Sequence, residues 1–261
     1  IECNYYAIYD SVDEKRQILN TANYLNIEKI YLIKRIPVLT YFYLFLFFFT
    51  KAENFIFGNL LDNHMMFLSK LINYKNIILV DDGIATINNY KYYRSNNNIT
   101  NKYPKRIIFF SIFDLGSNEF VVKNNFEFIF KSEKIISEEV YFIGQPMENI
   151  LGEIEYYRIL STVKILNPNM IYIAHRRDSN KKLLYISDMG ITVLKMTEII
   201  ELYLIKSSTL PKKVISFYST ALITLKLLFK DKIMVNCIFN NDLLSNDLIQ
   251  IFKNLKIKSE I

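Results

Sequence analysis

The sequence predicts an α/β protein built from parallel strands and the helices that connect them. Short apolar runs alternate along the chain with longer amphipathic runs, and this alternation is typical of βαβ units. Apolar residues make up 51% of the 261 residues, which is enough for a substantial core. With 22% charged residues beside that apolar content, the composition excludes a largely disordered chain.

The expected strands are short apolar segments followed by polar or turn-forming residues. The run NIILV is the clearest, because Asp81, Asp82 and Gly83 follow it directly and such residues end strands. Strands are predicted at Lys29–Ile36, Asn76–Val80, Arg106–Phe113, Phe126–Phe130, Glu139–Ile143, Met170–Ala174, Thr192–Leu194 and Lys213–Phe217.

The expected helices are longer segments in which apolar residues recur every three or four positions, as they do in Asn59–Asn73. Helices are predicted at Leu39–Thr50, Asn59–Asn73, Met147–Asn167 in one or two pieces, Thr197–Ile205, Thr220–Lys230 and Asn246–Leu255.

Two stretches depart from this alternating pattern. Ile36–Phe49 is almost entirely apolar but shorter than the ~20 residues of a membrane-spanning helix. We expect a buried helix there, with a peripheral membrane contact as the alternative. Asn88–Lys105 is polar, basic and rich in tyrosine. It is predicted to be a long loop, either a solvated excursion or a loop that contacts a substrate.

A charged segment, Lys131–Glu139, separates two parts of similar size. We therefore expect an N-terminal α/β domain over residues 1–137 and a C-terminal α/β domain over residues 138–261. Two Rossmann-like α/β domains that face a cleft form the GT-B architecture, which is the predicted fold class. Because the chain begins at Ile1 and not at Met, we also expect an N-terminal piece to be missing.

Charge and composition argue against several classes of binding site. The net charge of +6 favours an anionic partner, although the basic residues form no nucleic-acid-binding motif. The two cysteines and two histidines have no zinc-site spacing, so no metal site is expected and a reduced, intracellular setting is predicted. With only six glycines, the chain lacks the glycine-rich loops of dinucleotide-binding and P-loop proteins.

Polar residues that follow predicted strands are the candidates for chemistry, because open α/β sheets bind ligands at those ends. Asp81-Asp82-Gly83 is the first group. Two carboxylates followed by a glycine turn suit a general base or a metal ligand, and the alternative is an ordinary strand-end turn.

The second group is His175-Arg176-Arg177, directly after MIYIA. Arginine pairs with phosphate oxygens through two hydrogen bonds, and histidine donates a further hydrogen bond or a proton. The group therefore predicts a phosphate pocket. The alternative is one histidine beside two surface arginines.

The third group is formed by Ser216, Ser219 and Thr220, where the strand KVISF leads into a helix. Hydroxyls and free amides at a helix N-terminus suit an anion, and the alternative, a simple N-cap, is compatible with that role. Glu198 and Glu201 precede this segment. Either carboxylate could bind a ribose diol or simply face solvent.

In this order, the motifs resemble those of the bacterial sialyltransferases of glycosyltransferase family 52. That family carries an acidic D/E-D/E-G triplet, a histidine motif and a paired Ser-Ser/Thr motif, and here these correspond to Asp81-Asp82-Gly83, His175-Arg176-Arg177 and Ser219-Thr220. The strings ILVDDGIATI, YFIGQPM, YIAHRRD and ISFYSTALITL extend the resemblance from about Ile56 to Phe229. Proline usually follows the histidine in that family, whereas Arg176 stands here.

The resemblance implies an inverting transfer of sialic acid from CMP-N-acetylneuraminic acid, without a metal or other cofactor. Asp81 would be the general base, with Asp82 as the fallback, and His175 would hydrogen-bond or protonate the departing phosphate. Ser219 and Thr220 would hold that phosphate, and Glu201, in preference to Glu198, would bind the ribose. The other substrate-binding candidates are Asp82, Gly83, Arg176, Arg177 and Ser216.

The implied partners are CMP-sialic acid and a galactose-terminated acceptor of a bacterial lipooligosaccharide or capsule, with α-2,3 transfer as the family's model. The expected location is the cytoplasm, with peripheral contact to the inner face of the membrane, and a homodimer is one open option. Two other functions remain open. One is a GT-B transferase with another donor, or a polysialyltransferase; the other is a non-catalytic membrane-surface binding protein.

Overall fold

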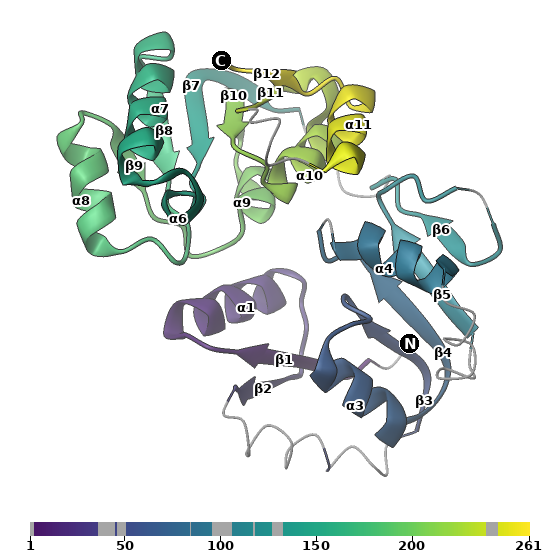
Figure 1. Ribbon diagram of the computed structural model, residues 1–261. Helices are drawn as coiled ribbons and strands as arrows, with labels where there is room; N and C mark the ends of the chain where they lie inside the picture. The colour runs from purple at the N-terminus through teal and green to yellow at the C-terminus, as the bar shows by residue number, and fades with distance from the viewer. Residues whose placement is uncertain are drawn as a thin grey trace. The chain divides into compact units, whose positions relative to one another are not determined.

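The computed structural model describes residues 3–35, 45, 51–83, 85–95, 106–116, 118–126, 133–238 and 245–261. The chain divides into two compact units (Figure 1). The first unit comprises Ile1–Asp10 and Ile30–Asn125, and the second comprises Ser11–Lys29 and Phe126–Ile261. This division differs from the expected boundary at 137/138, because the segment after Phe126 and the helix α1 (Val12–Tyr24) pack with the second unit.

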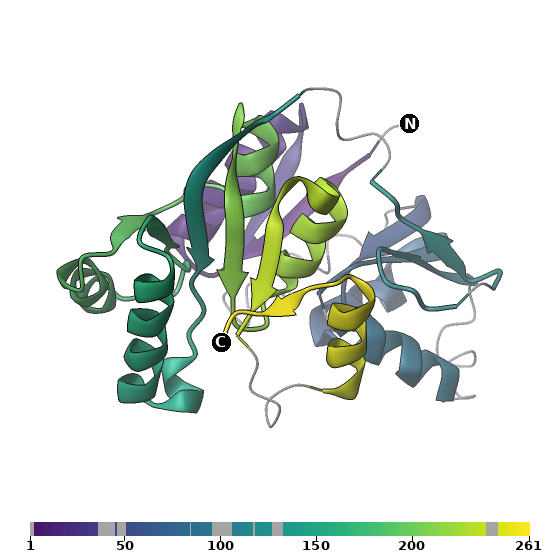
Figure 2. The same ribbon diagram turned by 90° about the horizontal axis from the view of Figure 1, so that it is seen from above.

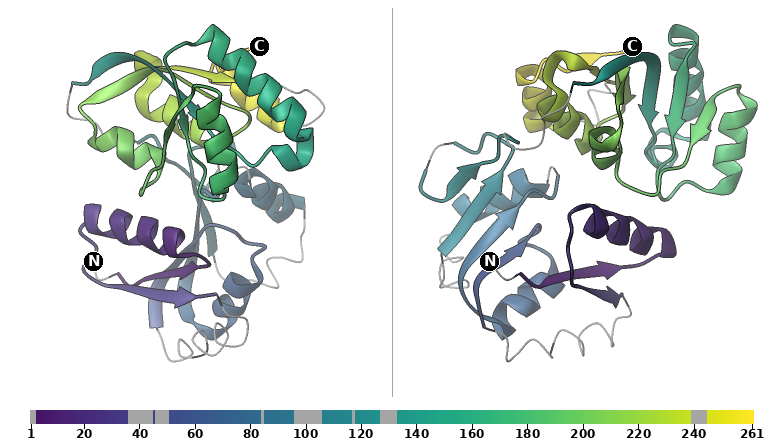
Figure 3. Two further views of the ribbon diagram at one scale, coloured as in Figure 1. Left: turned by 90° about the vertical axis from the view of Figure 1, so that its left-hand side faces the viewer. Right: turned by 180° about the vertical axis from the view of Figure 1, so that it is seen from behind.

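The first unit contains a four-stranded parallel sheet in the order β3-β4-β5-β6. Its strands lie side by side in blue to teal in Figure 3. They are β3 (Lys51–Phe57), β4 (Asn73–Val80), β5 (Arg106–Ser111) and β6 (Val121–Lys123). A separate parallel pair is formed by β1 (Tyr5–Tyr9) and β2 (Ile30–Lys34). The buried core is centred on Ile77 and Phe109, which are fully covered.

Two helices of the first unit are α3 (Asn63–Leu71) and α4 (Ala85–Ser95). The helix α4 corrects the prediction of a loop from Asn88, because residues 88–95 are helical. Tyr90 and Tyr93, three positions apart, both pack against Phe109. These tertiary contacts stabilise a helix whose asparagines have low helix propensity. The rest of that predicted loop, most of Ile36–Phe49 and most of the predicted strand Phe126–Phe130 lie outside the described residues.

The second unit contains a six-stranded parallel sheet in the order β12-β11-β10-β7-β8-β9. Figure 2 shows β7, β10 and β11 running side by side in one direction. The strands are β7 (Ile135–Ile143), β8 (Met170–Ile173), β9 (Thr192–Leu194), β10 (Thr209–Ser216), β11 (Met234–Cys237) and β12 (Lys258–Ser259). The helices are α6 (Glu148–Leu151), α7 (Glu153–Leu166), α8 (Asn180–Asp188), α9 (Ile200–Lys206), α10 (Thr220–Phe229) and α11 (Asn246–Asn254), with a 3₁₀ turn at Lys230–Lys232.

The strand β7 is longer than predicted. Residues 135–138 belong to the charged segment taken as a domain junction, yet Ile135, Ile136 and Ser137 pair with β10. The helical region after β7 was predicted in one or two pieces, and the structure has two. Gly152 separates α6 from α7 with φ 83°, a backbone conformation that glycine adopts at little cost.

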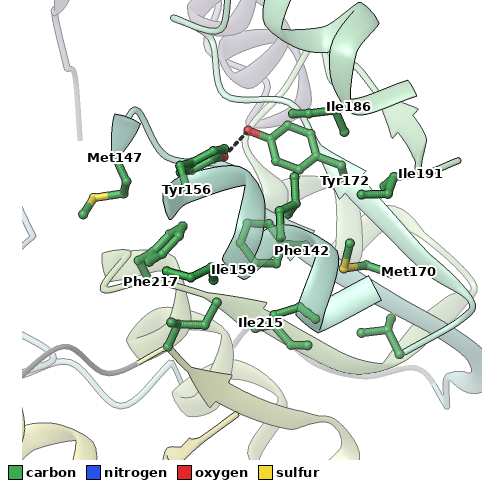
Figure 4. Close-up of a cluster of buried hydrophobic side chains, with 14 of the residues drawn as sticks. Phe142, Met147, Tyr156, Ile159, Met170, Tyr172, Ile186, Ile191, Ile215 and Phe217 are labelled. Carbon is green, nitrogen blue, oxygen red and sulfur yellow. Dashed lines mark hydrogen bonds between the residues drawn. The ribbon is translucent and has the colours of Figure 1, made fainter. Parts of the chain in front are cut away.

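The core of the second unit packs large aromatic side chains between β7, β8 and α7 (Figure 4). Tyr156 and Tyr172 are fully buried there, and their hydroxyls lie 3.0 Å apart. Phe142 stacks on Tyr172 and meets Phe217 edge-on. Among the described residues, no helix has the length and apolarity needed to cross a bilayer.

Candidate functional site

The strand order of the second unit creates a natural ligand position. β8 and β9 lie on one side of β7, whereas β10, β11 and β12 lie on the other. Parallel α/β sheets bind ligands outside the carboxyl ends of the strands where the order reverses in this way. The three loops at that place follow β7, β8 and β10. They carry Gln145, His175 and Ser219 respectively.

The acidic triplet lies in the first unit, directly after β4. Both carboxylate oxygens of Asp81 accept hydrogen bonds, from Ser111 Oγ at 2.6 Å and from the Ile112 backbone N–H at 2.7 Å. Burial raises the pKa of Asp81, while hydrogen bonds from Ser111, Ile112 and Thr86 and the charge of Lys123 oppose that rise. Asp81 is therefore a fixed carboxylate with more basic character than an ordinary aspartate, which suits a general base.

The neighbouring residues have different environments. The side chain of Asp82 is exposed, and its backbone N–H donates to Thr86 Oγ1 at 2.9 Å. A Cβ at Gly58 would lie 3.1 Å from Asp82 Cβ, so the end of β3 packs closely against this turn. Gly83 has φ 59°, which leads the chain into α4. Of the two adjacent carboxylates, only Asp81 is oriented by hydrogen bonds to both of its oxygens among the described residues.

The loop after β8 holds His175 by its main chain and its ring. The His175 backbone N–H donates to Asp178 Oδ2 at 2.8 Å, and the Arg177 backbone N–H lies 3.2 Å from His175 Nδ1. Burial lowers the pKa of His175, and the charges of Arg176, Arg177 and Lys182 add to that effect, whereas Asp178 opposes it. The ring is therefore neutral at pH 7. Because Nδ1 accepts a hydrogen bond, the ring proton resides on Nε2.

A buried polar network lies behind this loop. The Tyr172 hydroxyl donates to Asp178 Oδ2 at 2.9 Å, so the Tyr156 hydroxyl must donate to Tyr172. Lys182 Nζ lies 2.7 Å from Asp178 Oδ1 and 2.9 Å from Glu148 Oε2. The Lys182 side chain is 5% exposed and that of Asp178 is fully buried. The attraction between these charges and the additional hydrogen bonds together offset the free-energy cost of removing the charges from water.

Burial lowers the pKa of Lys182, but nearby Tyr156 and the hydrogen bonds to Asp178 and Glu148 outweigh it and raise the pKa to about 12. The cation also lies 3.3 Å from the carbonyl oxygen of Gln145. Lys182 thus connects the loop after β7 to the loop that carries His175.

The two arginines after His175 differ in their contacts. Arg176 forms an ion pair with Glu14 of α1 at 3.1 Å. The Arg177 side chain is exposed and has no hydrogen bond or ion pair within the described part of the chain. The Arg177 guanidinium could therefore bind a phosphate at this loop, whereas the Arg176 guanidinium already pairs with the Glu14 carboxylate.

The hydroxyl segment contains one correction. Ser219 is the N-cap of α10, with its Oγ accepting from the Ala221 N–H at 3.3 Å, and Thr220 is the first residue of that helix. Ser216, expected to bind substrate, is fully buried. Its Oγ lies 2.8 Å from the carbonyl oxygen of Ile143 and 3.1 Å from Gln145 Oε1. Because its hydroxyl points into the protein, Ser216 orients Gln145 and does not face a ligand.

The two glutamates are also distinct. Glu201 of α9 accepts a hydrogen bond from Thr224 Oγ1 of α10 at 2.5 Å, so it is attached to the helix that begins at the hydroxyl segment. Glu198 pairs instead with Lys206 at 2.6 Å and lines a cavity of about 430 Å³. The remaining residues around that cavity are Asn20, Asn23, Tyr24 and Thr197.

The comparisons with known proteins give a structural likeness but no sequence match. The sequence matches no protein-family model and no curated protein. The structure is similar to that of a 2,6-sialyltransferase from Photobacterium sp. JT-ISH-224, with a TM-score of 0.55 and 12% sequence identity. The likeness covers 97% of this chain and 76% of that one.

The chain has a GT-B-like fold. The Photobacterium enzyme was solved in a ternary complex with the donor product CMP and the acceptor substrate lactose. In this GT-B-like protein, the second unit carries His175, Ser219, Thr220 and Glu201, and the first unit carries Asp81. No group of three or more histidine, cysteine, aspartate or glutamate side chains that could hold a metal ion occurs in the part of the chain that the structure describes.

Several residues that contact the candidate residues, directly or through one another, were not predicted from the sequence. Ser111 contacts Asp81 in the first unit, and the others, in the second unit, are Gln145, Glu148, Asp178 and Lys182. Asp178 offered a signal, because it stands three positions after His175, where a carboxylate can accept backbone N–H groups of a tight turn. Gln145 stands in YFIGQPM, one of the strings that resemble family 52, but neither Gln145 nor Lys182 offered a local signal of its contacts. Their contacts join residues 71 and 37 positions apart in the chain.

Proposed function

We propose that this protein is a sialyltransferase that moves sialic acid from CMP-N-acetylneuraminic acid to a terminal galactoside. The observation that carries the proposal is the position of His175, held by the Arg177 N–H at its Nδ1, where the strand order reverses in a GT-B-like fold. This contact leaves Nε2 as the donor, and the lowered pKa of His175 favours the neutral ring. A donor of this kind is suited to the phosphate of a departing nucleotide. The likeness to a sialyltransferase solved with CMP and lactose supports this choice of substrates.

In the proposed reaction, an acceptor hydroxyl attacks the anomeric carbon of sialic acid, and the bond from that carbon to the CMP phosphate breaks with inversion. The hydroxyl proton passes to Asp81, whose raised pKa makes it a better proton acceptor at neutral pH than an ordinary aspartate. The leaving phosphate receives a hydrogen bond or a proton from His175 Nε2.

The remaining groups of the second unit bind the nucleotide. Ser219 and Thr220 offer a hydroxyl and backbone N–H groups at the start of the ten-residue helix α10, where the helix dipole favours an anion. Arg177 supplies positive charge, and the carboxylate of Glu201, held by Thr224, accepts from the ribose hydroxyls. Because these donors neutralise the phosphate, we propose that the reaction proceeds without a metal ion.

The finer parts of the proposal rest on the sequence motifs. The resemblance to family 52 supports a bacterial surface glycan, of lipooligosaccharide or capsule, as the acceptor, and a reaction at the cytoplasmic face of the membrane. The Photobacterium enzyme is a 2,6-sialyltransferase, whereas α-2,3 transfer is the family 52 model. Digestion of the product with linkage-specific sialidases distinguishes the two linkages.

The test is CMP release from CMP-N-acetylneuraminic acid with lactose, in the presence of EDTA. Wild type should release CMP only when lactose is present, and Asp81→Asn should lower kcat by about 10³-fold. Asp114→Asn is the control, since this exposed side chain accepts from the Gly116 N–H at 3.2 Å and has no other hydrogen bond with the described residues. Asp82→Asn, compared directly with Asp81→Asn, identifies the base.

Three results would contradict the proposal. Absence of both turnover and CMP binding by calorimetry would reject the donor, and binding of UDP in preference to CMP would favour a transferase with another donor. Liposome binding that survives the loss of Asp81 and His175, without any nucleotide binding, would favour the non-catalytic alternative.

A further inference from the structure

Gln145 lies at the carboxyl end of β7, the strand at which the order of the second sheet reverses. β10 and β8 flank β7. The loop of Gln145 therefore lies between the loop that leads to Ser219 and the loop that carries His175. A side chain in this position is well placed to contact a ligand that both neighbouring loops bind.

The orientation of the Gln145 side chain follows from its hydrogen bonds. Its Oε1 accepts from the backbone N–H of Tyr218 at 3.1 Å, and the Ser216 hydroxyl lies at the same distance from it. A backbone N–H is always a donor, so the amide atom facing it must be the oxygen. The reverse orientation would place an NH₂ group against an N–H group.

The amide nitrogen therefore points away from Tyr218 with two N–H groups to donate. It has no hydrogen-bond partner within the ranges that the structure describes, although Gln145 is partly buried. The main chain of Gln145 is held as well, because its carbonyl oxygen accepts from the Met147 N–H at 2.8 Å and from Lys182 Nζ at 3.3 Å. A donor held in one orientation before the ligand arrives loses little entropy on binding.

We propose that the Gln145 side-chain amide binds an anionic oxygen of the donor substrate, supplied by its phosphate or by the sialic acid carboxylate. The inference rests on the proposed function, since it assigns a further donor contact within the same site. An amide NH₂ group aligned by its own carbonyl oxygen is a neutral donor that suits such an oxygen.

Two substitutions separate the donor from the rest of the side chain. Gln145→Glu retains an oxygen for the Tyr218 N–H but replaces the NH₂ group with a second oxygen that repels an anion. Gln145→Met has a similar volume and no charge, so any loss that it shows reflects the missing hydrogen bonds. Gln250→Glu is the matched control, because the exposed Gln250 side chain on α11 donates to Asn254 Oδ1 at 3.0 Å and has no other side-chain hydrogen bond among the described residues.

The measurement is the Kd of two probes by calorimetry: CMP, and CMP-3-fluoro-N-acetylneuraminic acid, which is not turned over. We expect Gln145→Glu to raise the Kd of the fluorinated donor by about 10- to 100-fold and Gln145→Met by about 10-fold. If the Kd of CMP rises by the same factor as that of the fluorinated donor, the phosphate is the partner of Gln145. If only the Kd of the fluorinated donor rises, the sialic acid carboxylate is the partner.

Thermal melting confirms that each variant is folded before binding is measured. If wild type binds both probes and the folded Gln145 variants bind them as tightly as Gln250→Glu does, the assignment of Gln145 is wrong while the proposed function stands. If wild type binds neither probe, the proposed function is wrong, and the assignment of Gln145 is wrong with it.

Discussion

The backbone N–H of Arg177 lies 3.2 Å from Nδ1 of His175, and this contact determines which ring nitrogen carries the proton. Protonation of Nδ1 would place an N–H group against the Arg177 N–H. Burial lowers the pKa of His175, and the charges of Arg176, Arg177 and Lys182 add to that effect while Asp178 opposes it, so the neutral ring is favoured. A neutral His175 would therefore have its N–H group at Nε2, the nitrogen that the proposed reaction uses as the donor.

The lowered pKa of His175 predicts a pH-dependent stability. The unfolded chain binds a proton at His175 more readily than the folded protein, so the free energy of unfolding decreases as the pH falls below about 6.5 and stops decreasing below the folded pKa. The melting temperature of wild type should therefore fall more between pH 7.5 and pH 5 than that of His175→Gln. His64→Gln is the control for the removal of a histidine, and equal falls in wild type and His175→Gln would contradict the prediction.

Ser111→Ala should shift the acidic limb of the pH–rate profile. Asp81 must be ionised to accept a proton, and the Ser111 hydrogen bond is the strongest influence that lowers its raised pKa. Loss of that bond raises the pKa further, so kcat should fall off at a higher pH than in wild type. Lys123→Met should move the limb in the same direction by a smaller amount, because the charge of Lys123 is the weakest of the opposing causes. A limb that stays in place in Ser111→Ala would argue against Asp81 as the base.

Gly144→Ala should lower both stability and activity. A Cβ at position 144 would lie 2.3 Å from the Tyr172 hydroxyl oxygen, which donates to Asp178 and so supports the His175 loop. We expect a loss of about 1–3 kcal/mol in the free energy of unfolding, measured by denaturant titration, together with a lower kcat. The added Cβ would also lie 2.6 Å from Tyr172 Cζ and 3.0 Å from the Ile173 carbonyl oxygen. Tyr172→Phe should therefore not rescue Gly144→Ala, and unchanged stability of Gly144→Ala would contradict the prediction.

Lys182→Met should be strongly destabilising. It would leave Asp178 and Glu148 without their shared cation, and removing one member of a buried ion pair costs about 3–5 kcal/mol. Lys181→Met is the matched control on the same helix, because the Lys181 side chain is exposed, and its effect should stay within about 0.5 kcal/mol. Glu148→Gln added to Lys182→Met removes one of the stranded charges and should recover part of the loss. Similar urea midpoints for the Lys181 and Lys182 variants would contradict the role of this network.

Local patterns accounted for much of the fold and for the positions of the candidate residues. The strands at Met170–Ile173 and Thr192–Leu194 and the helices at Thr220–Phe229 and Asn246–Asn254 were predicted to within one or two residues. The helix α4 and the strand β1 were not, because their sequences are too polar or too short for a clear apolar period. The extension of β7 to Ile135 was missed because the charged residues around it resemble a linker.

By itself, the sequence determined the α/β class, the GT-B expectation and the polar groups that follow β4, β8 and β10. Periodicity and strand ends are local properties, so they can be recognised without knowing the fold. Only the tertiary structure decided that β7 lies between β10 and β8, that Ser216 is buried, and that Lys182 contacts the carbonyl oxygen of Gln145. Those facts depend on strand pairing and on hydrogen bonds between residues far apart in the chain, and no local pattern specifies them.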